Sequence, residues 1–324
     1  AAAATAGAAA AAGGAPPAAS AGSGTRTSTA ASPCHEVSYL RIQKTGSTTF
    51  GESIIPKMTA KHHQTGRGRF HMEYRGATAQ PRACAVTVLR DPVERFMSEF
   101  AFARGHEGFL MTQDQWDFAD EDLPWLKQVQ KMPNDTAALL EYLRSPRNPT
   151  RNRQALYLLG FDRVNCDRQC CGLCSRTHPG HPAHAYDWDK DHDVLLARAK
   201  EHLLGLRAFG VLDCYVDSVK VIAGELGWEP EEAADMAGKI HRRKQDKRRL
   251  LAGLLSTSVS RVSAARHTAM LLNAGSAAGL WRSALDPALR AEIDGLNRLD
   301  IELVDFARRQ LYDRYKVNCS RQAP

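Results

Sequence analysis

The chain alternates short apolar runs with longer segments whose apolar residues recur every three or four positions. The short runs predict buried strands at 37–43, 84–89 and 206–213. The helical spacing predicts helices at 48–58, 92–104, 135–144, 150–159, 192–205, 214–227 and 286–315. Strands that alternate with helices indicate an α/β fold with a mainly parallel sheet.

Three segments fall outside this alternation. Residues 105–133 show no regular pattern, and the stretch 166–190, rich in Cys, His, Pro and Gly, is typical of a loop insertion. Residues 1–25 carry no charge and no Leu, Ile, Val or Phe, so they do not predict a membrane span. We therefore expect a disordered, low-complexity stem or linker over 1–33 and a single domain over 34–324, with 166–190 inserted into it. The chain does not begin with Met, so a membrane anchor could precede residue 1.

The charge balance favours anionic ligands. The 324 residues carry a formal net charge of +7, with a pI near 9.0. The densest basic run, "HRRKQDKRR" at 241–249, is either a solvated helix face or a contact for a polyanionic substrate. It lacks interleaved aromatic residues, so a nucleic-acid partner is not predicted.

The cysteines indicate the redox compartment. There are eight of them: Cys34, Cys84, Cys166, Cys170, Cys171, Cys174, Cys214 and Cys319. The cluster "CDRQCCGLC", with histidines at 178, 181 and 184 nearby, leaves a zinc knuckle open as an alternative. The even count and the glycosylation sequons at Asn134 and Asn318 favour disulfides in a glycoprotein of an oxidising, secretory compartment.

The segment "IQKTGSTTFG", at 42–51, lies between a predicted strand and a predicted helix. Gly46 allows a close approach of the backbone to an anion. Three residues supply hydroxyl groups and the N–H groups of a helix N-terminus, which favour negative charge: Ser47, Thr48 and Thr49. In the common phosphate-binding loop GxxxxGK[ST] the lysine follows the glycines, whereas Lys44 precedes Gly46. An ordinary strand–turn–helix remains the alternative reading.

A second segment, "VLRDPVERFMSEF" at 88–100, favours anion binding over an ordinary strand–turn–helix. Arg90 stands at the end of a predicted strand, and Ser98 follows eight residues later in the next helix. Both can point toward one anion, Arg90 as a forked and permanently charged donor and Ser98 as a neutral one. Together, the two segments predict a protein that holds a nucleotide at two separated phosphates.

These segments resemble the sulfotransferases that use 3'-phosphoadenosine 5'-phosphosulfate (PAPS), and most of all the heparan sulfate 6-O-sulfotransferases. Further blocks stand in the family's order over roughly 36–316: "RNRQALYLLG", "AKEHLLGLRAFGVLDCYVDSVKVI" and "EIDGLNRLDIELVDFARRQLYDRY". The resemblance implies a P-loop-like three-layer sandwich with a central mainly parallel sheet flanked by helices. Ser47 departs from the family's second Gly, and the Cys-rich insertion has no counterpart.

The resemblance also assigns roles in binding PAPS. Lys44 would contact the phosphosulfate and stabilise the charge on the leaving phosphate, with no metal required. The residues expected to bind PAPS are Lys44, Thr45, Gly46, Ser47, Thr48, Thr49, Arg90, Ser98, Ser260 and Arg261.

The acceptor hydroxyl needs a general base, and the family places a His between its two PAPS segments. In "RFHMEYRG" this residue is His71, with His62 and His63 as competitors. Residues expected to contact the acceptor are Glu73, Tyr74, Phe102 and Arg153. Phe102 stands where the family carries a His.

The expected function is transfer of a sulfuryl group from PAPS to a hydroxyl of an anionic or neutral polysaccharide. The resemblance places such an enzyme in the Golgi lumen, as a type II membrane protein whose anchor is not in this sequence. A tyrosylprotein sulfotransferase and a lectin-like module for sulfated glycans are alternatives on the same scaffold. A nucleotide phosphotransferase is the alternative from another class, and it would need a lysine after the glycines and a metal-binding acid.

Overall fold

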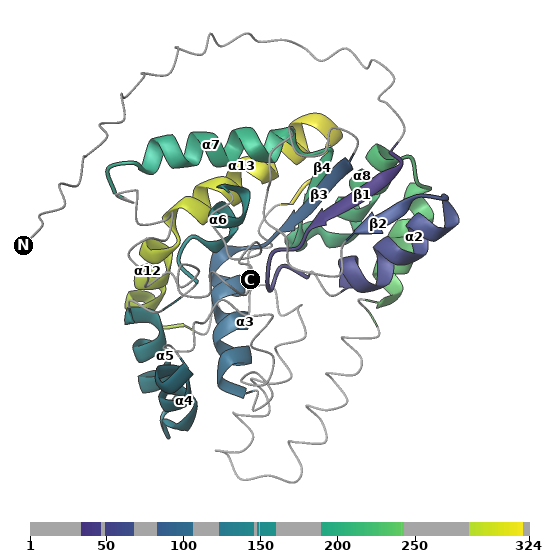
Figure 1. The fold of residues 1–324 in the computed structure, drawn as a ribbon. Coiled ribbons are helices and arrows are strands. Elements are labelled where there is room, and N and C mark those ends of the chain that lie inside the picture. Colours follow the sequence, from purple (N-terminus) through teal and green to yellow (C-terminus); the bar gives the residue numbers. More distant parts are fainter. Residues whose placement is uncertain are drawn as a thin grey trace, which may run out of the picture. The chain divides into compact units, whose positions relative to one another are not determined.

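The protein, seen in a computed structural model, combines a parallel sheet with helices in an α/β fold (Figure 1). The structure describes residues 34–46, 49–67, 83–105, 123–145, 148, 150–159, 189–240, 242 and 285–319. All of them belong to one unit, Pro33–Pro324.

The described sheet has four parallel strands in the order β2-β1-β3-β4. They are β1 (Glu36–Leu40), β2 (Thr65–Arg67), β3 (Ala83–Leu89) and β4 (Ala208–Val211). The three predicted strands and their parallel direction are confirmed, with β1 and β4 shorter than predicted. The three residues of β2 contain no apolar side chain, so hydrophobic patterning could not reveal this strand.

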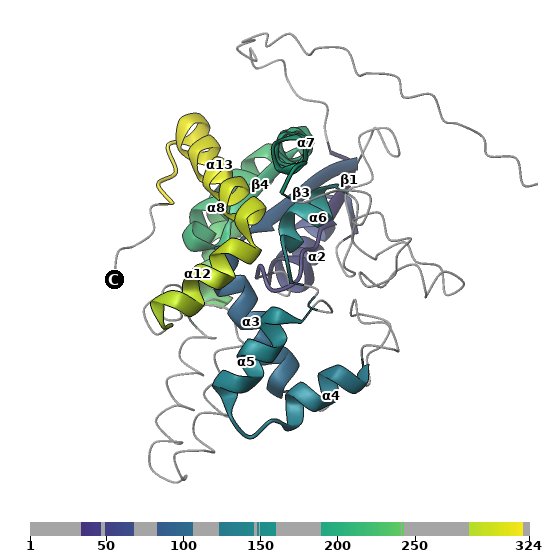
Figure 2. The same cartoon turned by 90° about the vertical axis from the view of Figure 1, so that its left-hand side faces the viewer.

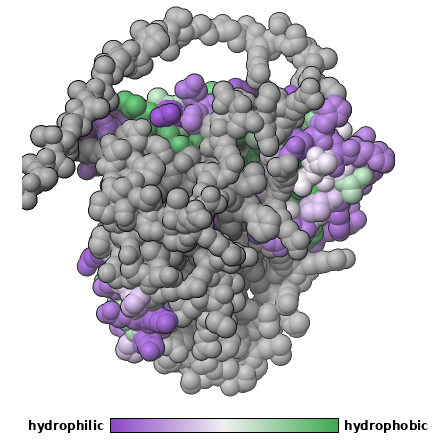
Figure 3. Space-filling view, viewed as in Figure 1, coloured by the Kyte–Doolittle hydropathy of each residue, from purple (hydrophilic) through white to green (hydrophobic). Residues whose placement is uncertain are grey.

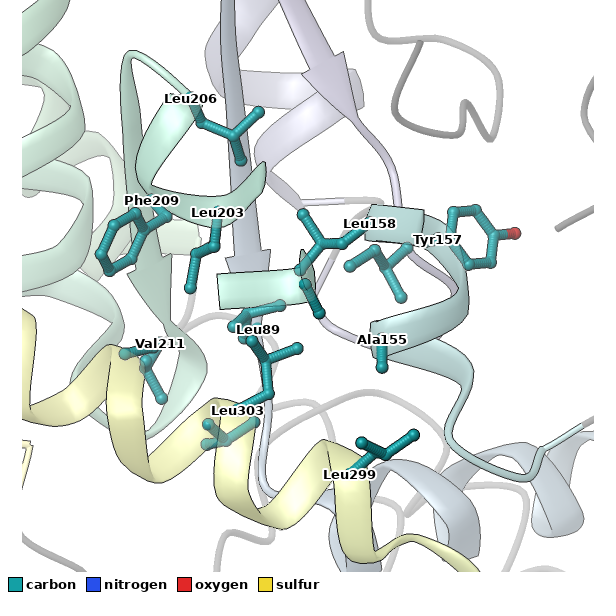
Figure 4. Close-up of a cluster of buried hydrophobic side chains, with 14 of the residues drawn as sticks. Leu89, Ala155, Tyr157, Leu158, Leu203, Leu206, Phe209, Val211, Leu299 and Leu303 are labelled. Atoms are coloured by element: carbon teal, nitrogen blue, oxygen red, sulfur yellow. The ribbon is translucent and has the colours of Figure 1, made fainter. Parts of the chain in front are cut away.

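The two faces of the sheet are covered by different helices because side chains alternate along each strand. On one face, Val37 and Tyr39 pack against the π-helical turn η1 (Phe50–Ile54), α2 (Ile55–Lys61) and α8 (Tyr215–Leu226). On the other face, Leu89 and Phe209 pack against α6 (Arg153–Leu159), α7 (His192–Gly205) and α13 (Arg298–Tyr315), as Figure 4 shows. The sheet therefore lies between two layers of helices.

A third hydrophobic cluster lies beyond the carboxyl end of β3. It joins α3 (Pro92–Gly105), α4 (Leu123–Lys131), α5 (Asp135–Arg144) and α12 (Pro287–Leu296), which are grouped together in Figure 2. Tyr142 is fully buried there, with its ring stacked on Trp125 at 5.6 Å between centroids. This cluster fixes the direction in which α3 leaves the sheet.

Two predictions of local structure were wrong. The stretch 105–133, predicted to be irregular, contains α4, and the predicted helix 286–315 is divided into α12 and α13. The division occurs at Asn297, whose side-chain amide donates to the Ile293 carbonyl (2.9 Å) and accepts from the Asn152 N–H (3.3 Å). The apolar spacing continues through Asn297, so the pattern gives no sign of the break. Residues 230–240 are also helical.

Two disulfides join distant parts of the described chain, as the cysteine count predicted. Cys34–Cys84 links the starts of β1 and β3, and Cys214–Cys319 links the end of β4 to the segment after α13. Disulfides are typical of secreted or lumenal proteins. The cluster at 166–174 and its zinc alternative lie outside the described residues.

Among the described helices, none is both long and apolar enough to cross a membrane. The described surface in the view of Figure 3 is mostly hydrophilic. Among described residues the large hydrophobic side chains that remain exposed are few: Val194, Val216, Tyr312 and Tyr315.

We expect the Cys214–Cys319 disulfide to contribute about 2–5 kcal/mol to the free energy of unfolding, because it closes a long loop in the unfolded chain. Its cysteines are separated by 105 positions. Urea denaturation of Cys214→Ala, Cys319→Ala and the double variant measures this. Each single variant should lose about as much stability as the double variant, since either substitution breaks the bond. If the loss of stability in the double variant equals the sum of the two single losses, the pairing of Cys214 with Cys319 is contradicted.

Candidate functional site

The two predicted anion-binding segments begin at neighbouring strand ends. The chain runs from β1 outward to β2, returns to β3 on the other side of β1, and continues outward to β4. The carboxyl ends of β1 and β3 therefore form a switch point of the strand order, where ligands bind in open parallel sheets. The turn with Lys44 follows β1 and Arg90 follows β3, and the two strands lie side by side in Figure 1.

The turn after β1 has an unusual backbone. Lys44 and Gly46 both have positive φ angles, 64° and 79°. The Gly46 carbonyl accepts from the N–H groups of Thr49 (3.0 Å) and Phe50 (3.3 Å), which starts the following helix. The positive φ angle favours glycine at residue 46, and a Cβ atom there would also lie 2.7 Å from Cδ1 of Leu212, whose side chain would have to shift. The turn also contains Thr45, whose fully buried hydroxyl donates to the Ile42 carbonyl at 3.0 Å.

Arg90 connects the two predicted segments. Its Nη1 donates to the Lys44 carbonyl at 3.0 Å, and its Nη2 lies 3.6 Å from Oε2 of Glu94. The Arg90 side chain is 4% exposed. The structure thus brings Arg90 and the lysine turn into direct contact.

The backbone of Arg90 is held by Gln154 of α6. The Gln154 side chain accepts from the Arg90 N–H (2.8 Å) and donates to the Arg90 carbonyl (2.9 Å). Asp300 of α13 accepts from the backbone N–H groups of Gln154 (3.1 Å) and Ala155 (2.8 Å), which places α6. Sequence reasoning did not assign this role to either residue, because nothing in the local pattern shows that their partners are distant backbone groups.

Arg153, a predicted acceptor contact, lies in an interior network of ion pairs. It is 1% exposed, and its Nη1 donates to Glu99, which also accepts from Nη1 of Arg95 at 2.6 Å. Arg95 in turn donates to the Thr150 carbonyl at 2.6 Å. The ion pair with Glu99 occupies part of this guanidinium, and the acceptor contact of Arg153 stays a prediction.

The surroundings of Lys44 weaken its positive charge. Burial lowers the pKa of the Lys44 ammonium to about 8; the Glu99 carboxylate opposes this shift, and the Arg90 cation adds to it. Burial also lowers the pKa of Arg90, against the nearby carboxylates of Glu94, Asp213 and Asp91. An anion placed between Lys44 and Arg90 would relieve this repulsion.

Asp91 has a structural task. Its Oδ1 accepts from the N–H groups of Val93 (3.1 Å) and Glu94 (3.2 Å) and so caps α3. Its Oδ2 lies 3.7 Å from Nη2 of Arg308, which also pairs with Asp213. Arg308 of α13 therefore connects the segments that follow β3 and β4.

Ser98 lies on α3, eight residues after Arg90, and is 1% exposed. Within the described part of the chain its hydroxyl has no hydrogen-bond partner. Buried polar groups are almost always hydrogen-bonded. The Ser98 hydroxyl is therefore a group that can donate to a ligand.

Several predicted site residues lie outside the described residues: Ser47, Thr48, His71, Glu73, Tyr74, Ser260 and Arg261. Phe102 lies on α3, but its side chain also lies outside the description. Thr49 is buried at the start of η1, where its side chain makes no capping hydrogen bond. Of the residues predicted to bind PAPS, the structure describes Lys44, Thr45, Gly46, Thr49, Arg90 and Ser98. No protein-family model and no curated protein matches the chain.

We expect Lys44 to titrate near pH 8, about two units below an ordinary lysine. NMR of lysine labelled with ¹³C at Cε measures this midpoint, and Lys44→Arg assigns the signal. Because the pKa of Lys44 is lowered to about 8 in the folded state, the site carries the full lysine charge only well below pH 8 and loses it as the pH rises through 8. A midpoint above pH 10 would contradict the burial and the Arg90 repulsion.

Proposed function

We propose that the protein is a PAPS-dependent sulfotransferase that transfers the sulfuryl group to a hydroxyl of a polysaccharide, on a P-loop-like three-layer scaffold. The observation that carries the proposal is the contact of the Arg90 guanidinium with the Lys44 carbonyl at the switch point of the sheet. Two cations from separate strand ends suit a ligand with two separated phosphates. The resemblance of these segments to heparan sulfate 6-O-sulfotransferases supplies the identity of that ligand.

The lysine before the glycine suits sulfuryl transfer. In the proposed reaction the acceptor oxygen attacks sulfur, and the bond between sulfur and the bridging phosphate oxygen breaks. The electron pair of that bond leaves with 3'-phosphoadenosine 5'-phosphate (PAP). Lys44 stabilises the negative charge that develops on this phosphate, and the turn's N–H groups hold its oxygens. The proposal requires no metal ion or third phosphate, so no lysine after the glycines is needed.

In this proposal Arg90 and Ser98 bind the 3'-phosphate. A guanidinium can donate two parallel hydrogen bonds to a phosphate, and a hydroxyl adds a neutral donor. The support is that Arg90 is fixed through its backbone by Gln154 and that the Ser98 hydroxyl is buried without a partner among the described residues. Nη1 of Arg90 also donates to the Lys44 carbonyl, and a guanidinium that is already held loses little conformational entropy when a ligand binds.

The proton of the acceptor passes to His71 in this proposal. A neutral imidazole near its ordinary pKa can act as a general base at physiological pH. The two disulfides agree with a lumenal setting, and we propose the Golgi lumen because polysaccharide sulfation of the family's type takes place there. Glu73, Tyr74 and Phe102 remain proposed acceptor contacts.

The first test is isothermal titration calorimetry of the wild-type protein with PAP and with ADP, both without Mg²⁺. We expect PAP to bind and ADP to bind at least about tenfold more weakly, because ADP lacks the 3'-phosphate. Arg90→Ala should remove most of this preference, a loss of about 1.5–3 kcal/mol for a charged hydrogen bond. Arg144→Ala, which breaks a surface pair with Glu292, serves as the matched control.

Two results would count against a sulfotransferase. Equal affinity for ADP and PAP would show that the protein does not recognise the 3'-phosphate. Nucleotide binding that requires Mg²⁺ would favour a nucleotide phosphotransferase.

We expect His71→Ala to lower kcat by about 10²–10⁴-fold and to leave the Kd for PAP unchanged, because a general base acts on the acceptor. Transfer of radiolabelled sulfate from PAPS to heparan-type polysaccharide measures turnover. His63→Ala is the control, since His63 belongs to the turn after α2. Equal losses of turnover in both variants would remove the assignment to His71.

A further inference from the structure

Arg90 has a buried carboxylate as its neighbour. Nη2 of Arg90 and Oε2 of Glu94 are 3.6 Å apart, and both side chains are 4% exposed. Glu94 lies in the first turn of α3, four positions after Arg90. Its carboxylate opposes the effect of burial on the pKa of Arg90 more strongly than any other group does. The pair is thus a close ion pair away from water.

Such a pair conflicts with the binding of an anion. A buried guanidinium needs a counter-charge, and Glu94 supplies it in the ligand-free protein. A phosphate that binds Arg90 brings its own negative charge to the same place. If Glu94 stays, the phosphate and the carboxylate repel each other at short range in a medium of low dielectric constant.

The other carboxylates near Arg90 are committed elsewhere. Asp91 caps α3 through its Oδ1. Asp213 pairs with Arg308. Of the carboxylates that act on Arg90, Glu94 has the largest effect, and it lies 3.6 Å from Nη2 of the guanidinium that we propose binds phosphate.

We propose that Glu94 is an internal competitor for the anion at Arg90: it neutralises the guanidinium in the ligand-free protein and yields when a phosphate binds. The inference rests on the proposed function, because it takes Arg90 as the group that holds the 3'-phosphate. Its consequence is a site that does not retain PAP tightly after transfer. Glu94 therefore sets the affinity and the release rate of the nucleotide without touching the transferred group.

The test compares the wild type with Glu94→Gln, which keeps the side-chain shape and removes its charge. We expect the Kd for PAP to fall at least about tenfold, with a slower release rate, because one close repulsion has been removed. Calorimetry measures Kd, and displacement in a stopped-flow instrument measures release. Substitution of a residue with a purely structural role would weaken PAP binding. Tighter PAP binding therefore distinguishes a competitor from a structural residue.

Glu292→Gln is the matched control. It makes the same change of net charge at an exposed ion pair with Arg144, and PAP affinity should stay within about twofold of the wild type. Urea denaturation checks that each variant folds. If Glu94→Gln does not fold, Glu94→Met is used in its place, because a methionine side chain needs no hydrogen-bond partner.

Inorganic phosphate serves as a second probe and separates the two proposals. Tighter phosphate binding by Glu94→Gln, with no preference of the wild type for PAP over ADP, would support the competitor and refute the sulfotransferase. A wild type that prefers PAP, with unchanged or weaker PAP binding in the folded Glu94 variant, would overturn the competitor alone. If neither protein binds PAP or phosphate, both proposals fail.

Discussion

The side-chain amide of Gln154 bonds both backbone groups of Arg90, and the arrangement of the site depends on this pair of hydrogen bonds. Arg90 follows the end of β3, beyond the last residue of β3 that pairs with a described strand. Without Gln154 its buried N–H and C=O would lose their partners, at about 1–3 kcal/mol for each group. Asp300 holds the backbone of Gln154 in turn, so the position of α13 is transmitted to the end of β3.

A second constraint is the balance of buried charge beneath the strand ends. Arg95 and Arg153 share the carboxylate of Glu99, while Arg90 faces Glu94. Removing one partner of a buried pair leaves the other charge uncompensated, which costs about 3–5 kcal/mol. Burial lowers the pKa of Lys44 beside this network, with Glu99 opposing the shift and Arg90 adding to it. The guanidinium of Arg90 faces the internal carboxylate of Glu94, and in our proposal also an external anion.

Strand order and α3 place these groups at one edge. Because β1 and β3 are parallel neighbours with outward connections on opposite sides, their carboxyl ends meet there. The third hydrophobic cluster, built around Phe96 and Tyr142, sets the direction of α3 and with it the positions of Glu94, Ser98 and Glu99.

The sequence by itself determined the elements with a strong hydrophobic period and the turn chemistry. It placed α5 and α7 correctly, put Gly46 in the turn after the first strand, and brought Lys44 and Arg90 to strand ends. These features depend on local spacing and backbone angles. Tertiary structure alone decided the break at Asn297 and the interior place of Arg153, because their hydrogen-bond and ion-pair partners are distant in sequence. Glu94 stands four positions after Arg90 in the sequence, but the burial of both side chains is seen only in the tertiary structure. Our proposal that Glu94 competes with a bound anion for Arg90 depends on that burial.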